Sequence, residues 1–153
     1  MLEAIIAHQL FNDEMKTFLL LFFLFMTTSV FAQNDTVYCE SGLKYVQLKP
    51  GVGKKAMNGQ RVKVSYVGKL MTGEVFEALE DGDVFMFKIG DPGIISAWNE
   101  GFKLMSTGEK GIFITPPFLA YGTKGAKDPT GEKEYLVPPN ATLIFEVELI
   151  SIK

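Results

Sequence analysis

The side chains of this chain that could act on a ligand are mainly aromatic. The 153 residues include 13 Phe, 5 Tyr and 1 Trp, but only 1 His and 1 Cys. His8 lies in a segment that reads as a leader, and Cys39 follows it. A Ser–His or Cys–His nucleophile system needs a histidine in the working domain, and a zinc site needs several His or Cys ligands. The sequence therefore excludes both and leaves binding by apolar surfaces as the chemistry to consider.

The single tryptophan, Trp98, stands in the stretch IGDPGIISAWNEG, just after Ile94 and Ile95. Asp91 suits a helix N-cap and Pro92 suits the first helical position, so the pattern predicts a helix from there to about Thr107-Gly108. Apolar residues recur along it at helical spacing. A tryptophan in such a pattern is more often part of the core than of a binding site, and the pattern alone leaves both interpretations open.

The N-terminal region has the layout of a secretory signal. Residues 18–26 form an uncharged apolar run that Lys16 precedes, and Val30-Phe31-Ala32 offers a cleavage site after Ala32. The run is shorter than the ~20 residues of a membrane-spanning helix, although an uncleaved leader that anchors the chain is the alternative. Because the acidic start does not suit a signal, Met15 is the predicted initiator. The expected segments are 1–14 as an upstream extension, 15–32 as signal peptide, 33–41 as a flexible N-terminus and 42–153 as the domain.

The charge of the mature chain is close to balanced. Removing 1–32 takes away one basic and three acidic side chains and so leaves 14 Lys and Arg against 15 Asp and Glu. Such a chain has no electrostatic attraction for nucleic acid or an anionic membrane. Cys39 cannot form an internal disulfide, and a free thiol is expected, with a bond to a partner or lipidation as alternatives.

The rest of the chain predicts a twisted antiparallel sheet. Apolar and polar residues alternate in five segments, and short turns such as 71–74 join several of them. Together with the single helix they indicate an α+β domain. Residues 122–139 are a long polar loop, which is typical of a functional flap or a mobile insertion. The predicted strands are 43–48, 61–70, 85–89, 111–115 and 142–153.

Six motifs, in order, resemble the FKBP-type peptidyl-prolyl cis–trans isomerases over roughly residues 42–153, and the opening Gly42-Leu43-Lys44-Tyr45 is similar to exported bacterial members. Singly most of these motifs are weak, but six in sequence are specific. The motifs are VKVSYVGKL (62–70), GEVFE (73–77), FMFKIG (85–90), IISAWNEG (94–101), FLAYG (118–122) and VPPNATLIFEVEL (137–149).

The resemblance implies a half-open sheet wrapped around one short helix, with a shallow apolar pocket between them. Trp98 would form the floor under the proline ring of a substrate, so that it is both core and site. The resemblance also assigns the main-chain N–H of Ile95 and the hydroxyl of Tyr121 to substrate carbonyls, and the carboxylate of Glu77 to the polar edge near Tyr66. The catalytic residues expected are Tyr66, Phe76, Glu77, Trp98, Tyr121 and Phe145, and the substrate-binding residues are Phe85, Ile94, Ile95, Leu136 and Val137.

Several positions depart from the family pattern. Glu77 stands where most members have Asp, which could lower activity, and Ser96 and Ala97 replace residues that are often basic and Gly. An insertion over 124–135 makes residue matching unsafe, and Tyr135 or Leu136 are alternatives for a place in the pocket.

The expected function is isomerisation of X–Pro bonds to assist folding of exported proteins. The expected partners are proline-containing polypeptides, with a macrolide such as rapamycin as a candidate ligand. No cofactor, metal or nucleic acid is expected. The protein should be a monomer that is periplasmic or secreted. A non-catalytic peptide-binding or chaperone module is the alternative that Glu77 keeps open, and an adhesion domain without a pocket is a third.

Overall fold

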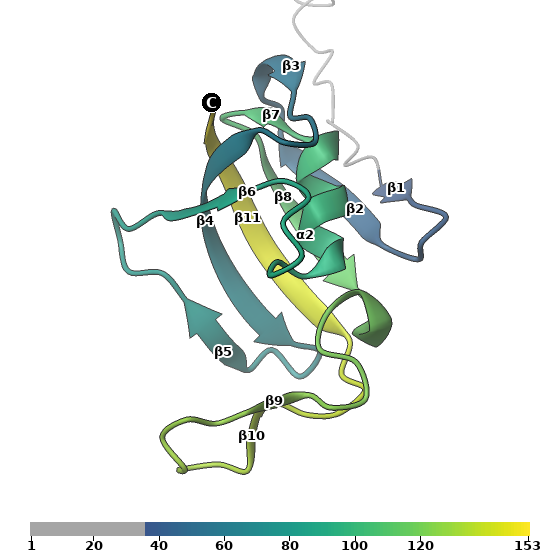
Figure 1. Cartoon of the computed structure of the whole chain (residues 1–153), viewed down its shortest axis with the longest axis vertical. Coiled ribbons are helices and arrows are strands. Elements are labelled where there is room, and N and C mark those ends of the chain that lie inside the picture. The colour runs from purple at the N-terminus through teal and green to yellow at the C-terminus, as the bar shows by residue number, and fades with distance from the viewer. Residues whose placement is uncertain (1–35) are drawn as a thin grey trace, which may run out of the picture. The chain divides into compact units, whose positions relative to one another are not determined.

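The computed structural model describes residues 36–153, whose body is a seven-stranded sheet (Figure 1). The strands follow the order β1-β2-β8-β11-β4-β5, and β6 also pairs with β4. All of these pairings are antiparallel, as the short connections require. The bounds are Thr36–Tyr38 (β1), Lys44–Lys49 (β2), Arg61–Leu70 (β4), Val75–Ala78 (β5), Phe85–Lys88 (β6), Lys110–Thr115 (β8) and Leu143–Ile152 (β11).

The long strands β4 and β11 form the centre of this sheet. Their register pairs Tyr66 with Val147 and Gly68 with Phe145. Buried and partly exposed side chains alternate along both strands, so that one face of each lies in the core. This is the period-2 pattern that the sequence shows, and it gives each strand one buried face.

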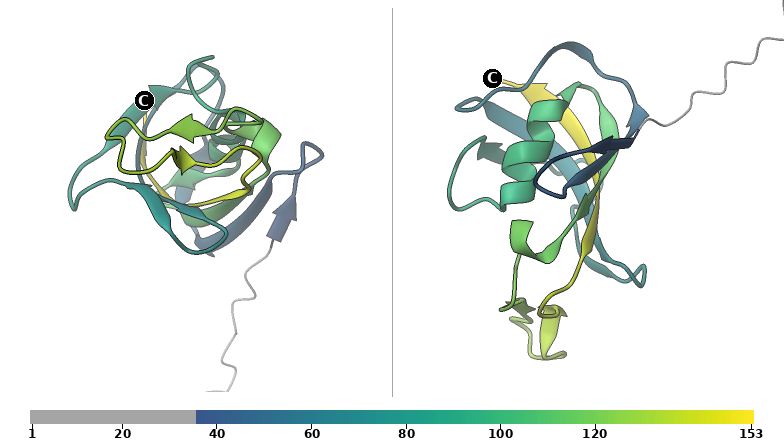
Figure 2. Two further views of the ribbon diagram at one scale, coloured as in Figure 1. Left: turned by 90° about the horizontal axis from the view of Figure 1, so that it is seen from below. Right: turned by 90° about the vertical axis from the view of Figure 1, so that its right-hand side faces the viewer.

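A short helix, α2 (Ser96–Gly101), lies against the inner face of the sheet, and the 3-10 turn η1 (Phe102–Leu104) continues it. Figure 2 shows α2 on one side of the sheet, with the opposite face of the sheet uncovered by a helix. The predicted α+β architecture, a twisted antiparallel sheet around one short helix, is confirmed. The core between helix and sheet contains Leu43, Tyr45, Val62, Val64, Ile89, Ala97, Trp98, Phe102, Met105, Phe113, Leu143, Phe145 and Leu149.

The predicted start of this helix at Asp91 is wrong. The N-cap is Ile95, which has extended dihedrals and makes no side-chain capping bond. Oδ1 of Asp91 instead accepts a hydrogen bond from the N–H of Gly93 at 2.8 Å and so closes a turn before the helix. The helix also ends earlier than predicted, because Met105 is extended and Ser106–Thr107 form the short strand β7.

Two segments carry more regular structure than the sequence analysis expects. Thr36–Tyr38, which the sequence analysis assigns to a flexible N-terminus, pairs with Lys44–Val46 as an edge strand. Within the long polar loop, β9 (Ala126–Lys127) and β10 (Tyr135–Val137) form a hairpin. A two-stranded pair joins β3 (Val52–Lys55) to β7, and a second 3-10 turn, η2, covers Pro117–Leu119.

The expected leader segments, 1–14 and 15–32, lie outside the described residues, as do 33–35. Within residues 36–153, helices are too short or too polar to cross a membrane.

Candidate active site

A pocket of about 190 Å³ opens between α2, the loop before it and the strands β4 to β6. Its wall is mostly aromatic and aliphatic, and its polar groups are two phenol hydroxyls and one carboxylate. The lining residues are Tyr66, Glu77, Phe85, Gly93, Ile94, Ile95, Trp98, Tyr121 and Phe145.

The strand β4 carries Tyr66 on its buried face, so the side chain points from the sheet toward α2 and remains 7% exposed. Its ring stands edge-on to Phe85 of β6, with centroids 6.2 Å apart. The pairing of β4 with both β5 and β6 therefore brings residues from three strands to the same wall.

Trp98 lies in the middle of a cluster of aromatic rings. It is 5% exposed, and its ring centroid lies between 4.7 and 5.8 Å from those of five neighbours. Four of these five contacts are edge-to-face, and such packing favours one orientation of the indole. Trp98 therefore belongs to the core and to the pocket wall at once. The neighbours are Tyr66, Phe85, Phe87, Phe102 and Phe145.

The amide of Asn99 shapes the loop that presents Ile94 and Ile95. Its Oδ1 accepts from the N–H of Gly90 at 2.7 Å, and its Nδ2 donates to the carbonyls of Asp91 (2.9 Å) and Ile94 (3.2 Å). These bonds tie the first turn of α2 to the end of the preceding loop. The main-chain N–H of Ile95, at the pocket, takes no part in a main-chain hydrogen bond within residues 36–153.

The polar side of the pocket joins Glu77 to two tyrosines. Burial, and then the acceptor oxygen and charge of Glu77, raise the pKa of Tyr66 above its ordinary value. Burial and the same carboxylate raise the pKa of Tyr121. Both hydroxyls stay protonated at neutral pH; the proton of Tyr66 faces Glu77, whereas that of Tyr121 can be donated to an oxygen in the pocket.

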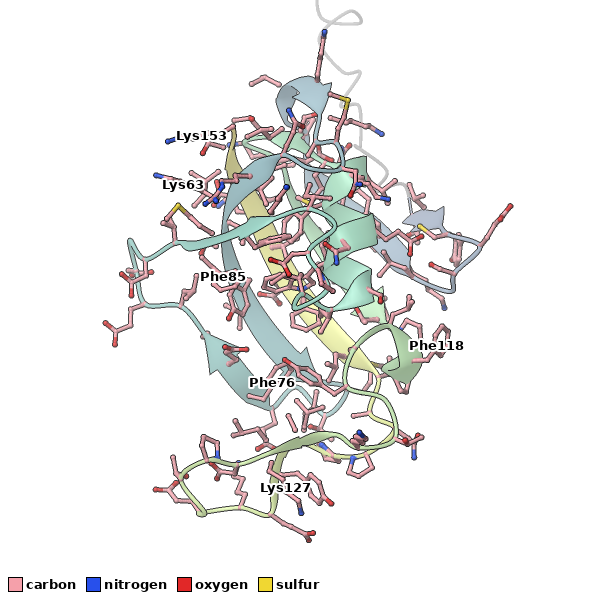
Figure 3. All side chains as sticks on the ribbon, viewed as in Figure 1. Lys63, Phe76, Phe85, Phe118, Lys127 and Lys153 are labelled. Carbon is pink, nitrogen blue, oxygen red and sulfur yellow. The ribbon has the colours of Figure 1, made fainter. Side chains whose placement is uncertain are left out.

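Three predicted site residues do not line the pocket. The ring of Phe76 packs edge-to-face against Tyr121 (6.5 Å) and Phe145 (5.8 Å) and supports the wall. Figure 3 shows Phe76 and Phe85 on the same side of the domain, near β5 and β6. Val137 is buried in the core and Leu136 lies beside it in β10, outside the lining.

Gly93 lines the pocket and was not among the predicted site residues. A signal for it exists in the sequence, because Asp91-Pro92-Gly93 is a turn motif directly before two of the predicted pocket residues. The prediction of a helix from Asp91 hid this turn.

The pocket offers shape, apolar contact and hydrogen-bond donors. Residues 36–153 contain no cluster of three or more His, Cys, Asp or Glu side chains that could hold a metal ion.

A further carboxylate, Glu109, is buried away from the pocket and accepts hydrogen bonds from Tyr45, Gln47 and the N–H of Ser106. Because its acceptor oxygens are occupied by the protein itself, its role is structural.

Residues 53–150 match the family described as FKBP-type peptidyl-prolyl cis-trans isomerase. "FK506-binding protein 4" of Neurospora crassa is 37% identical to this chain over a match that covers 78% of it. The "39 kDa FK506-binding nuclear protein" of Drosophila melanogaster is 36% identical over a match that covers 79% of this chain. The matches cover 24% and 32% of those relatives, so this chain spans about a quarter to a third of their length.

Solved structures agree with this assignment. The peptidyl-prolyl cis-trans isomerase of Pseudomonas syringae superposes with a TM-score of 0.66 at 32% identity, covering 80% of this chain and 84% of that one. AtFKBP13 superposes with a TM-score of 0.68 at 35% identity, covering 78% and 99%. The matched residues, the fold and the pocket between helix and sheet together show that the chain belongs to the FKBP-type peptidyl-prolyl cis–trans isomerase family.

Proposed function

We propose that this chain catalyses rotation about X–Pro peptide bonds in polypeptide substrates. The observation that carries the proposal is the composition of the pocket: five aromatic side chains and two isoleucines surround a space of about 190 Å³, with Tyr66, Tyr121 and Glu77 as polar groups. A proline ring is a compact apolar group that suits such a space.

The physical basis is the difference between the planar and the twisted amide. Rotation about the peptide bond has a barrier of about 18–20 kcal/mol, because it destroys amide resonance. The planar amide is more dipolar than the twisted one, so water stabilises the planar form more. A pocket that replaces water by apolar walls favours the twisted form in relative terms, which is the differential binding that catalysis requires.

The proposed role of each lining residue follows from its position in the pocket. Trp98 supplies a flat wall for the proline ring, and Phe85, Ile94 and Phe145 enclose it. The hydroxyl of Tyr121 and the main-chain N–H of Ile95 donate to substrate carbonyls. These roles are proposals that the family resemblance and the pocket geometry support.

Glu77 takes the place of an aspartate in the family pattern, and its carboxylate is exposed at the pocket edge. It orients the Tyr66 hydroxyl, whose pKa it raises. Phe76 acts by supporting Tyr121 and Phe145. Leu136, which is partly buried in β10 and does not line the pocket, is assigned to a contact with the part of a bound peptide that extends beyond the pocket, whereas the core position of Val137 leaves it a supporting role behind Leu136.

A protease-coupled turnover assay on residues 33–153 tests the proposal. Acceleration of cis-to-trans conversion of a short X–Pro peptide, blocked by a macrolide such as rapamycin, is the expected result. Absence of acceleration over the uncatalysed rate at micromolar protein would reject catalysis. Binding of the peptide without acceleration would instead favour the non-catalytic binding module, which the Glu77 departure makes the second candidate.

The cellular context is a further part of the proposal. Export is supported by the pattern of 15–32, and folding of exported proteins is the corresponding role. The nuclear relative does not support export. N-terminal sequencing of the protein isolated from its native cells, with fractionation, distinguishes a chain that begins at residue 33 from one that keeps its leader.

A further inference from the structure

The connection between β5 and β6 borders the pocket at both of its ends. Glu77 on β5 and Phe85 at the start of β6 both line the pocket, so the residues between them form part of its rim. Main-chain hydrogen bonds fix the connection, from Leu79 to the carbonyl of Tyr66 (3.3 Å) and from Asp83 to that of Glu80 (3.0 Å). Figure 1 shows this connection at the left border of the sheet, beside β4.

The connection and the strand before it carry four acidic and no basic side chains. Glu77, Glu80, Asp81 and Asp83, which we call the acidic rim, are all exposed. No lysine or arginine occurs between Lys69 and Lys88. Among the described residues, none of the four carboxylates has an ion-pair partner.

Four other acidic side chains of the domain pair with lysines. Glu146 pairs with Lys69 at 2.6 Å, and Glu148 pairs with Lys110 at 3.0 Å, both on the outer face of the sheet. Two further pairs, Lys127–Glu134 and Lys133–Glu74, involve the β9–β10 hairpin. The acidic rim, by contrast, groups within seven residues of the sequence four carboxylates without an ion-pair partner in residues 36–153, and these create a local negative potential beside the pocket.

The pocket beside this rim has features of a ligand site in its own right. Trp98 lines it and is only 5% exposed, yet its Nε1 has no hydrogen-bond partner within residues 36–153. Glu77 belongs both to the rim and to the pocket lining, and after burial its charge contributes to the raised pKa of Tyr121, another lining residue. The rim and the pocket therefore adjoin each other.

We propose that the acidic rim selects polypeptides that carry lysine or arginine within two residues of the isomerised proline. This inference rests on the proposed function of the pocket, and it names the class of substrate. A basic residue beside the proline lies near the exposed carboxylates while the proline occupies the pocket, whereas an acidic residue there is repelled.

The size of the preference follows from the exposure of the charges. A rim carboxylate and a substrate charge about 8 Å apart in solvent interact weakly, but the interactions of several carboxylates with the same substrate charge add. We therefore expect a preference of about threefold to tenfold for a basic over an acidic peptide at low ionic strength. Salt screens such interactions within about 10 Å at 0.1 M and about 3 Å at 1 M. The preference should therefore disappear at high salt.

The experiment compares turnover of acetylated peptides with Lys, Leu or Glu immediately before the proline, and a second set with these residues two positions before it. We expect kcat/KM to follow Lys over Leu over Glu in at least one set, and the order to collapse at about 1 M NaCl. The Leu peptide measures isomerisation without a charge on the substrate. If the Leu peptide is turned over and the Lys and Glu peptides are turned over at equal rates in both sets, the rim inference is overturned and the proposed function stays intact.

A variant with Glu80→Gln, Asp81→Asn and Asp83→Asn removes three of the four rim charges and should lower the Lys-to-Glu ratio toward one. A matched control with Glu40→Gln, Glu146→Gln and Glu148→Gln removes the same charge away from the pocket and should keep the ratio. A preference that the rim variant leaves undiminished contradicts the assignment to these residues. If the Leu peptide is not turned over, the proposed isomerase activity is rejected. The rim inference is then tested by binding of the Lys and Glu peptides, measured by Trp98 fluorescence. Preferential binding of the Lys peptide supports the inference, and equal or absent binding overturns it.

Discussion

The phenol ring of Tyr66 stands edge-on to the indole of Trp98, with ring centroids 4.7 Å apart and planes inclined by 77°. This contact joins the central strand β4 to the helix α2, and both rings are nearly buried. An edge-to-face pair of this kind contributes about 0.5–1.5 kcal/mol beyond the area that it buries. The same contact builds the core and sets the angle between two walls of the pocket.

Replacing the indole should affect turnover as well as stability. Trp98→Leu removes the flat wall of the pocket, and loss of an aromatic contact worth about 0.5–1.5 kcal/mol in the transition state lowers kcat/KM by about twofold to tenfold. The peptide assay measures it, with Phe118→Leu as control, because that ring is 71% exposed and does not line the pocket. Unchanged turnover in Trp98→Leu, and also in Tyr66→Ala and Phe145→Tyr, would place the site elsewhere.

The charge of Glu77 should be visible in the titration of the tyrosines. Glu77→Gln removes a carboxylate that helps to raise the pKa of Tyr66 and of Tyr121, so both pKa values should fall. NMR titration of ring-labelled tyrosine follows the change. Glu80→Gln, on the neighbouring connection, serves as the control. Identical titration curves for wild type and Glu77→Gln would show that the carboxylate does not act on these hydroxyls.

A glycine in β4 leaves room for a ring that supports the pocket. A Cβ on Gly68 would lie 2.6 Å from Cζ of Phe76, so Gly68→Ala must push that ring away from Tyr121 and Phe145. Phe76 is partly exposed and can move outward, so the free energy of unfolding should fall by only about 1 kcal/mol, while kcat/KM drops by about twofold to tenfold.

Gly101→Ala is the matched comparison for this prediction. Its Cβ would lie 2.6 Å from the ring of Phe113, which is fully buried and has no free space to enter. We expect a loss of about 1–3 kcal/mol in urea unfolding, which outweighs the helix preference of alanine over glycine of about 1 kcal/mol. Equal effects of the two substitutions on stability and turnover would contradict the separation between core and pocket support.

Outside the pocket, the hydroxyl of Tyr45 donates to the buried carboxylate of Glu109 at 2.5 Å. Tyr45→Phe removes this bond and should lower the free energy of unfolding by about 1.5–3 kcal/mol, the usual range for a bond to a charged group. Urea denaturation at neutral pH provides the measurement. Tyr38→Phe is the control, since Tyr38 is 72% exposed, and a comparable loss there would remove the explanation.

Stability should also depend on alkaline pH. Burial, and then Glu109, raise the pKa of Tyr45 above the value of 10.0 expected for an unfolded chain. The folded state thus holds this proton more tightly, so the associated stability is complete below about pH 10 and is lost as pH rises toward the folded pKa. Urea unfolding above pH 10 should show a steeper fall for wild type than for Tyr45→Phe. Parallel curves for the two proteins would exclude this contribution.

Much of the fold was predictable because its strands and turns are local in sequence. The alternation of residues 61–70 and 142–153 predicted the strands β4 and β11 nearly to the residue, whereas their pairing at the centre of the sheet came only from the structure. The helix was harder, because Asp91 and Pro92 are favourable at a helix start and equally favourable in a turn. The amide of Asn99, eight residues further on, holds that turn through the carbonyl of Asp91, and such a contact has no signature in a single-sequence pattern.

The sequence by itself determined the chemistry that this protein can offer. Without a histidine after residue 8 and with one cysteine, residues 33–153 cannot build a Ser–His or Cys–His nucleophile system or a His/Cys zinc site, and their aromatic motifs point to binding a proline. Only the tertiary structure decided which of those aromatic residues share one pocket. Phe76 and Val137 follow the same patterns as Phe85 and Phe145, yet the first supports the wall and the second is buried in the core. The reason is physical: periodicity determines the face on which a side chain lies, whereas a pocket depends on how faces from separate elements meet and on the space that small residues such as Gly68 leave between them.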